Sequence, residues 1–422
     1  MSRKNSNGVI NSLAVIGESF RSIDISDEGI LTLMDETMFL HLFESVEDFR
    51  QPWKVEYRLP NLLMIIFLCI LENGKQPYIF IEDYIDAKKR FFSQYGLIEG
   101  GKCPSHDTIR RILTLLNADS LHENTIQGFY EFLRSLERNL TKQGDYRHIA
   151  VDGKEMRGSG RSKSSKSPKR NAAMLNVYDS SLMTAIRCVP VSDKENEIPV
   201  AQELLGMIEK KGVVFTADAL HCQKDTAKLI HDGKGVYVLT VKDNHPLLLE
   251  EIRSRFGRTG SKITKYELDQ RTVEILDLSK KTAMKDEWKG LKCYVRMYST
   301  KRSDPCERYF ISNATDHRLI IDGIEKRWTI ENDLHKPKDV DLGEDLVRST
   351  DKNALQNIAV LDNLVIQLFR IYQAITGKEY RKARRYFQFN PIECLNTILA
   401  IMSSEEIVNS LVLDLKRRKR AR

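Results

Sequence analysis

The stretch "YRHIAVDG" at residues 146–153 marks the point where the pattern of the chain changes. Its apolar centre predicts a short strand, with Asp152 directly after the run "IAV". Before it, apolar residues recur at three- and four-residue steps, as on one face of a helix. After it, apolar runs and amphipathic stretches alternate, which predicts a sheet with helices on its faces. We therefore expect an α/β fold from about residue 146, preceded by an all-helical N-terminal domain.

Upstream, we predict a poorly ordered leader at 1–35 and a helical N-terminal domain at 36–145. "CPSHDTIRRILTLLN" at 103–117 predicts a helix capped by Ser105 or Asp107. It could serve as a recognition helix, although any amphipathic basic helix would look the same. The longest apolar run, "LLMIIFLCIL" at 62–71, is half of a membrane span and favours a buried helix.

Downstream, residues 146–375 are predicted to form the α/β domain. "KITKYELDQRTVEILDLS", "LKCYVRMYST" and "ERYFISNAT" indicate strands with no helix between them, hence an all-β insertion at about 255–315. A helical pattern returns at "LIIDGIEKRWTIENDLH" (319–335). Residues 376–422 are predicted to be a helical segment followed by a basic tail, "KRRKRAR".

Composition sets broad limits. The chain has 422 residues, of which 41% are hydrophobic and 30% charged, so a soluble protein with a sizeable core is expected. A net charge of +7 is a mild, weak indication of polyanionic partners. The seven cysteines form no CxxC pair, and the N-terminus lacks a signal-peptide core. A reducing cytoplasm is therefore the default, with no membrane partner.

Three carboxylates stand out because of where they fall in this pattern. Asp152 and Asp218 follow apolar runs, and reactive groups of α/β sheets gather where strands end. Glu331 is on a later helix, with Arg327 and Lys338 spaced to share its face. Three carboxylates at one point repel each other unless divalent cations intervene. Two Mg²⁺ ions about 3.5–4 Å apart could then promote phosphodiester chemistry.

The residues alone leave ordinary alternatives open. An Asp at a strand end is more often a turn residue or a helix cap. Arg327 and Glu331 could be a surface ion pair worth only about 0.3–0.5 kcal/mol.

Several blocks together carry a resemblance. "IAVDGKEMRGS", "FTADALHCQKDTA", "YVLTVKDNH" and "RWTIENDLH" stand in the order found in bacterial insertion-sequence DDE transposases. The chain resembles most the branch that includes the H-repeat-associated proteins, from about residue 45 to 370. Arg327, Glu331 and Lys338 fit the last three positions of the Tyr-x₂-Arg-x₃-Glu-x₆-Lys pattern of the wider group, with Ile324 at the tyrosine position.

This resemblance implies an RNase H-like catalytic fold with a β insertion before the glutamate helix. It implies that Asp152, Asp218 and Glu331 are both the catalytic and the metal-binding residues. The expected cofactor is Mg²⁺, for which Mn²⁺ can substitute, and the expected chemistry is two-metal phosphoryl transfer.

Polar side chains near these carboxylates are predicted to contact DNA, and they are Lys154, Arg157, Lys242, Asn244, Arg327, His335 and Lys338. For Lys154 and Arg157 a solvated turn is an equal alternative. His335 could instead join a metal ion. The basic loop "RSKSSKSPKR" (161–170) and the basic tail could lie near DNA or be solvated.

The predicted function is that of a DNA transposase, which would bind terminal inverted repeats of double-stranded DNA, cleave strands and transfer them to a target. A homodimer on DNA is expected, in the bacterial cytoplasm and at the nucleoid when bound to DNA. Two alternatives stay open: an RNase H-like endonuclease without strand transfer, and a degenerate, non-catalytic DNA-binding relative.

Overall fold

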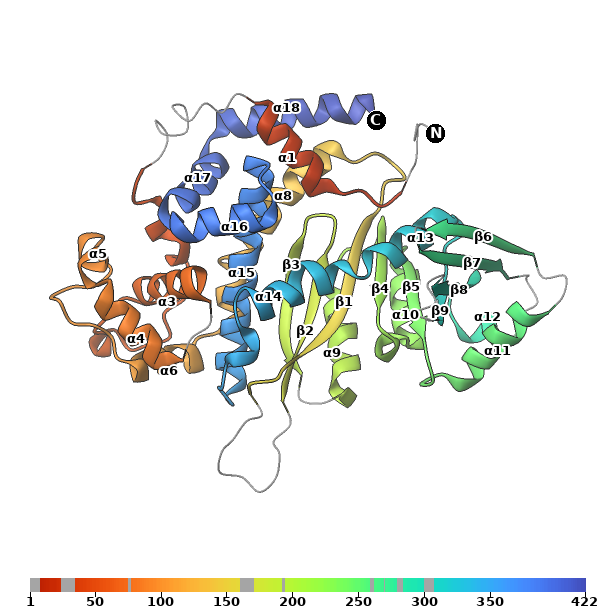
Figure 1. The fold of residues 1–422 in the computed structure, drawn as a ribbon, viewed down its shortest axis with the longest axis horizontal. Coiled ribbons are helices and arrows are strands. Elements are labelled where there is room, and N and C mark those ends of the chain that lie inside the picture. The colour runs from red at the N-terminus through yellow and green to blue at the C-terminus, as the bar shows by residue number, and fades with distance from the viewer. Residues whose placement is uncertain are drawn as a thin grey trace, which may run out of the picture.

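The computed structural model describes residues 8–23, 35–74, 77–159, 171–191, 194–258, 262–268, 270–278, 284–299 and 307–422. At its centre is a nine-stranded mixed sheet in the order β3-β2-β1-β4-β5-β9-β8-β7-β6 (Figure 1). The strands are β1 (Arg147–Met156), β2 (Ala172–Asp179), β3 (Thr184–Val191), β4 (Val213–Ala217), β5 (Val236–Val241), β6 (Ile263–Leu268), β7 (Arg271–Asp277), β8 (Cys293–Ser299) and β9 (Glu307–Ser312). The basic loop predicted at 161–170 lies outside the described residues.

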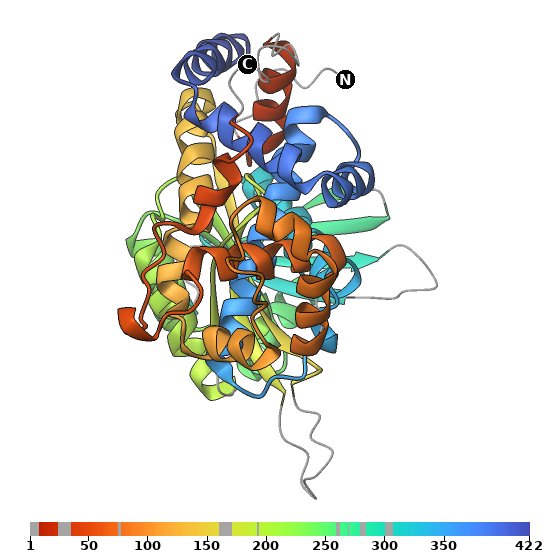
Figure 2. The ribbon, with the colours of Figure 1, turned by 90° about the vertical axis from the view of Figure 1, so that its left-hand side faces the viewer.

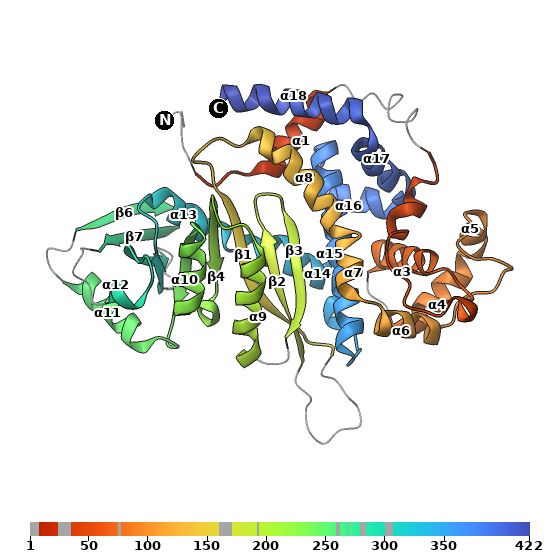
Figure 3. The same cartoon turned by 180° about the vertical axis from the view of Figure 1, so that it is seen from behind.

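Strand direction divides the sheet. β1, β4 and β5 form a trio of parallel strands with β4 in the middle. Every other neighbouring pair of strands in the sheet is antiparallel. Parallel neighbours need crossover connections, which here are the helices α9 (Lys194–Met207) and α10 (Lys224–Asp232). These two helices cover one face of the sheet (Figure 3). The chain has a mixed α/β fold, as the sequence predicts.

The opposite face of β1, β4 and β5 is covered by a continuous helical stretch (Figure 1). It consists of α13 (His317–Lys326), the π-helical turn η4 (Glu331–His335) and α14 (Lys336–Val340). Side chains alternate between the two faces along a strand, so His148 and Asp152 of β1 both point towards this stretch. The alternation therefore brings Asp152 and the helical Glu331 to the same face.

The predicted all-β insertion is a continuation of the same sheet. Strands β6 to β9 form an antiparallel meander that joins the parallel strands through the β5–β9 pair. α11 (Pro246–Gly257) precedes this meander, and the short helix α12 (Met284–Glu287) lies between β7 and β8. The insertion is therefore largely β-structure but contains one short helix.

Helices fill the region that the sequence predicts to be helical (Figure 2). They are η1 (Met38–Phe43), η2 (Pro52–Lys54), α3 (Leu59–Asn73), α4 (Tyr78–Ala87), α5 (Lys89–Gln94), α6 (His106–Leu115), α7 (Ala118–Glu123) and α8 (Ile126–Leu140). The run 62–71 is buried along its whole length in α3, and the Ser105 side chain caps α6. These helices share one apolar core with the sheet, so a separate N-terminal domain stays a prediction, as do the other domain boundaries.

The C-terminal helices are α15 (Lys352–Thr376), α16 (Tyr380–Phe389), α17 (Pro391–Ser403) and α18 (Glu405–Ala421). α15 is long and apolar enough to cross a membrane, but 89% of its most apolar window is buried inside the protein, as in the central helix of a globular core. The basic tail is the last part of α18, whose Leu411 and Leu415 are buried.

The prediction of a poorly ordered leader is wrong for residues 8–23. α1 (Ser12–Ser22) packs against α15 and α18 and buries Leu13, Ile16 and Phe20, which recur at helical spacing. At Gly17 a Cβ atom would lie 2.9 Å from the backbone oxygen of Ala374, so the close approach of the two helices requires glycine there.

Candidate active site

Asp152 lies within a strand and not at its end, which corrects the prediction. β1 continues to Met156, but its parallel pairing with β4 stops at Val151, opposite Ala217. Beyond that point β1 pairs only with β2, where Asn176 is the partner of Asp152. The end of β4, rather than the end of β1, opens the space into which the Asp152 side chain points.

Asp218 does follow a strand directly, as predicted. It is the residue between β4 and the short 3₁₀ turn η3 (Ala219–His221). Its Oδ1 accepts hydrogen bonds from the Arg327 guanidinium at 3.1 Å and from Lys242 Nζ at 3.2 Å. Two cations on different elements therefore converge on this one carboxylate.

Glu331 begins the π-helical turn η4, and Arg327 is at the C-terminal end of α13. A proline ordinarily ends or kinks a regular helix, but here the chain continues as α14 with Pro337 in its first turn. A proline ring crowds the carbonyl four residues before it. The wider π turn directly before Pro337 relieves this contact and lets the helix continue.

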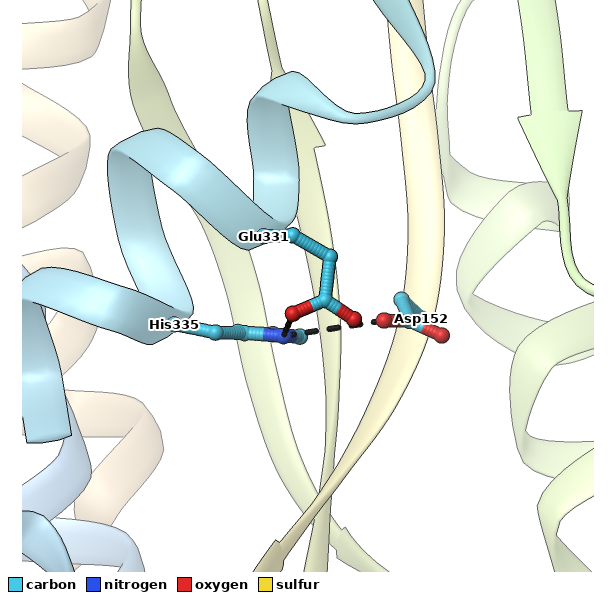
Figure 4. A group of neighbouring side chains, drawn as sticks. All are labelled: Asp152, Glu331 and His335. Atoms are coloured by element: carbon cyan, nitrogen blue, oxygen red, sulfur yellow. Dashed lines mark ion pairs between the residues drawn. The ribbon is translucent and has the colours of Figure 1, made fainter. Parts of the chain in front are cut away.

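The three carboxylates line one cavity of about 80 Å³, together with Arg327 and Trp328. Among the described residues, Asp152, Glu331 and His335 form a group whose possible ligand atoms all lie within 4.8 Å of one another (Figure 4). The structure thus brings together the three carboxylates that the sequence singled out from distant parts of the chain. Their catalytic and metal-binding roles stay predictions.

His335 differs from its prediction as a DNA contact, because it is only 4% exposed. Its Nδ1 lies 3.6 Å from Asp152 Oδ2 and 3.7 Å from Glu331 Oε2. Figure 4 shows its ring pointing towards the two carboxylates from one helical turn beyond Glu331. A side chain so enclosed cannot reach a DNA backbone, so we place it with the carboxylates.

The pKa values of the carboxylates differ sharply. Burial, followed by the charge of Glu331, raises the pKa of Asp152 to about 7. Burial also acts to raise the pKa of Asp218, but the backbone N–H of Ala219 and the charges of Arg327 and Lys242 outweigh it and lower that pKa. The imidazole of His335 beside it lowers the pKa of Glu331. Asp152 is therefore the group whose charge is least compensated by the protein.

Two family models match the chain: residues 143–368 match the one described as "Transposase DDE domain", and residues 40–127 the one described as "DDE_Tnp_1-associated". The chain belongs to the DDE transposase family. The family model for the DDE domain spans β1 to the middle of α15 and contains all three carboxylates.

Individual relatives agree with this assignment. YhhI of Escherichia coli (strain K12), provisionally named an H repeat-associated transposase, is 28% identical over 369 residues, which cover 80% of this chain and 92% of that protein. YncI of Escherichia coli O157:H7, also provisionally named a transposase, is 30% identical over 363 residues, which cover 81% of this chain and 89% of that protein. YbfQ of strain K12, named an inactive transposase, is 37% identical over 67 residues, which cover 16% of this chain and 77% of that protein.

Two lysines predicted to contact DNA have other partners in this DDE transposase-family chain. Lys338 is fully buried, where its Nζ donates to Asn176 Oδ1 at 3.3 Å and lies 3.9 Å from Glu344. Lys154 is mostly buried and pairs with Asp339 at 2.6 Å and with Glu344 at 3.6 Å. These contacts link β1, β2, α14 and η5 (Glu344–Leu346) beneath the site. We call the five residues that make them the buried brace: Lys154, Asn176, Lys338, Asp339 and Glu344.

The prediction of DNA contact is therefore wrong for Lys338, and the Lys154 ammonium is engaged in the brace.

The other residues predicted to contact DNA differ in their exposure and contacts. Arg157 is exposed, and the Lys242 side chain is 58% exposed at the edge of the site. Asn244 donates its side-chain amide to the backbone oxygen of Ala219 at 2.7 Å, which supports the turn after Asp218. Arg327, 18% exposed, lines the cavity.

Sequence reasoning missed a polar chain beneath the carboxylates. His148 Nε2 lies 2.9 Å from Thr216 Oγ1, and its Nδ1 lies 2.9 Å from Ser180 Oγ. Ser180 in turn shares a hydrogen bond with Thr329. These hydrogen bonds connect β1 to β4 near Asp218 and to the helical stretch near Glu331. A histidine inside an apolar strand was the available signal.

Glu197 on α9 was also missed. A Cβ atom at position 153 would lie 2.5 Å from Glu197 Oε1, so Gly153 leaves the room that this carboxylate needs. His221 Nε2, just after Asp218, is 3.1 Å from the same oxygen. The "DG" pair in "IAVDG" was the only sequence signal for this close approach.

Proposed function

We propose that this family member is the DNA transposase of an insertion sequence. It would bind terminal inverted repeats of double-stranded DNA, cleave at the element's ends and join the freed strands to a target. The observation that carries the proposal is the convergence of Asp152, Asp218 and Glu331 on one small cavity bordered by Arg327. In two-metal phosphoryl transfer on DNA, carboxylates bind the ions, and nearby cations position the phosphates.

We propose an RNase H-like arrangement for the catalytic part. It is supported by the strand order β3-β2-β1-β4-β5, by the parallel trio β1, β4 and β5, and by the helix that carries Glu331 across their face. Within the proposal, residues 146–375 act as the catalytic domain and residues 36–145 bind the DNA ends.

Members of this family generally use divalent metal ions, and the donors here suit such ions. Asp152 is 21% exposed and faces Glu331 and Asp218, so its charge needs a cation that the described side chains supply only in part. We propose Mg²⁺, replaceable by Mn²⁺, bound by Asp152, Asp218 and Glu331. Bound ions would activate the attacking oxygen and stabilise the leaving oxygen.

The chain's own cations have a separate task. Arg327 and Lys242 neutralise Asp218 and border the opening of the site, where a strand's phosphates would pass. Charge-assisted contacts of this kind fix the position of a strand without reading its sequence. The exposed Arg157 would extend the same contact along β1. A homodimer on DNA, in the bacterial cytoplasm and at the nucleoid, completes the proposal.

The test is cleavage of a DNA fragment that carries one element end. We expect Asp218→Ala and Glu331→Ala each to abolish cleavage while leaving end binding largely intact. Asp286→Ala, which removes an exposed carboxylate on α12, serves as the control and should cleave normally. Retained cleavage in either site variant removes that residue from the site.

A strand-transfer assay with a target plasmid separates the alternatives. Joined products support a transposase, whereas cleavage without joining supports an RNase H-like nuclease. End binding without cleavage, in the wild type and in Asp152→Ala alike, supports a degenerate DNA-binding relative.

A further inference from the structure

His335 is the polar residue of the site to which the proposed function gives no task. It is on the last position of η4, one turn beyond Glu331, and is 4% exposed. Its Nδ1 faces two carboxylates on different elements, Asp152 on β1 and Glu331 on η4 (Figure 4). Glu331 and His335 are four residues apart on one helical stretch, so they share the face that lies against the strand.

The separations fit a shared ion better than a hydrogen bond. Nδ1 is 3.6 Å from Asp152 Oδ2 and 3.7 Å from Glu331 Oε2, beyond the usual hydrogen-bond range. Ligand atoms bound about 2.1 Å from one ion lie roughly 3 to 4 Å from each other. Nδ1 therefore already lies at coordination-shell spacing from each carboxylate oxygen, and all three ligand atoms lie within 4.8 Å of one another.

The surroundings of the ring support the same use. Nε2 is buried and has no hydrogen-bond partner among the described residues. With the proton on Nε2, Nδ1 is the nitrogen whose lone pair faces the carboxylates and is available to an ion. The one nitrogen that faces polar atoms is Nδ1, on the side of the carboxylates.

We propose that His335 is the third protein ligand of the ion held by Asp152 and Glu331, and that this position therefore prefers Mn²⁺ over Mg²⁺. The inference rests on the proposed function for the presence of a divalent ion. Mg²⁺ strongly prefers oxygen, whereas transition-metal ions accept imidazole nitrogen more readily. Asp218 is not a member of this group, so we expect an ion at Asp218 to keep oxygen donors alone.

The decisive experiment is pulsed electron paramagnetic resonance on metal-free, full-length protein loaded with one equivalent of Mn²⁺ and no DNA. A coordinated imidazole gives a nitrogen coupling in that spectrum. We expect the coupling in the wild type and its loss in His335→Asn, in which an amide oxygen takes the place of Nδ1. His317→Asn is the matched control and should keep the coupling, because His317 faces Asp277 in the meander at 3.0 Å.

Calorimetric titration gives the selectivity. His335→Asn should weaken Mn²⁺ binding about tenfold or more and Mg²⁺ binding by less than about threefold. Equal losses for both ions, no nitrogen coupling in the wild type, or coupling that survives in His335→Asn would each overturn the inference. The wild-type spectrum decides the question even if His335→Asn does not fold.

The outcome is separable from that of the proposed function. Nitrogen coupling with no DNA cleavage would support the ligand assignment and refute an active transposase. Cleavage and strand transfer by a protein that binds Mn²⁺ through oxygen alone would support an active transposase and refute the ligand assignment.

Discussion

The cavity has two unlike flanks. On the open flank, the Asp218 side chain is 37% exposed and receives Arg327 and Lys242. On the closed flank, Asp152 is 21% exposed, and its neighbours at the cavity are another carboxylate and a buried imidazole. The carboxylate of the open flank is in direct contact with two cations, whereas Asp152 makes no ion pair with a lysine or arginine among the described residues. A metal ion should therefore matter most to the closed flank, and phosphate most to the open one.

The largest effects should come from neutralising either aspartate. Asp152→Asn and Asp218→Asn should each lower cleavage at least about a thousandfold, because each removes a proposed metal ligand. Their effects on the stability of the metal-free protein should have opposite signs. Asp218→Asn loses two ion pairs and should lower the melting temperature at pH 8, whereas Asp152→Asn removes an uncompensated charge and should raise it.

The pH dependence follows from the pKa of Asp152, which burial raises to about 7. In the unfolded chain this pKa is close to 3.8. The stability that the protonated carboxyl contributes is complete below pH 3.8 and is lost as the pH rises to 7. Over this interval the free energy of unfolding of Asp152→Asn should rise relative to that of the wild type, until it exceeds it by about 2–4 kcal/mol. A flat difference between pH 5 and 8, measured by thermal melting in chelator, would contradict the comparison.

The buried brace offers the next largest effect, because it supports the closed flank from below. Lys338→Met removes one of the lysines beside the buried Glu344 and also the hydrogen bond to Asn176. We expect a loss of about 1–3 kcal/mol in stability and a tenfold to hundredfold loss in cleavage. DNA affinity and its salt dependence should not change. A lower salt slope in Lys338→Met would instead support the phosphate contact that the sequence predicted.

The direction of the Lys338 side chain could not be predicted from the sequence. The spacing from Glu331 places Lys338 on the same face only if the helix is regular throughout. A π turn holds one extra residue, so everything beyond it is rotated by about 100° relative to an α-helix. Lys338 is turned inwards by this rotation. Pro337 was the signal of irregularity, but it did not show whether the helix would stop or widen.

Other parts of the site were predictable because the signal is local. Asp218 follows a fully buried five-residue strand, and the alternation of helix and strand around it predicts the α/β sheet. Asn176 and Glu344 were not predictable. Their roles depend on the register of β1 against β2 and on the path of the chain after α14, and neither leaves a mark in the local pattern.

The open flank is tested through its two cations. Arg327→Ala should weaken binding of end-containing DNA about tenfold and lower the salt slope of binding by about one. It should also raise the pKa of Asp218, since the guanidinium helps to lower it. Arg318→Ala is the matched control, because Arg318 pairs with Asp316 at 2.9 Å at the start of the same helix. Equal losses in the two variants would remove Arg327 from the DNA path.

The smallest effect is expected for Lys242→Ala. This ammonium is 58% exposed, so its pair with Asp218 at 3.2 Å is screened by water and salt. We expect about a twofold to threefold loss in DNA affinity at low salt that disappears above the ionic strength of a cell, since exposed charges are screened there. Lys224→Ala removes an equally exposed lysine paired with Glu287 and should have no effect on binding. A loss in Lys242→Ala as large as that in Arg327→Ala, and insensitive to salt, would mean that Lys242 is enclosed when DNA is bound, so that the open flank closes over its substrate.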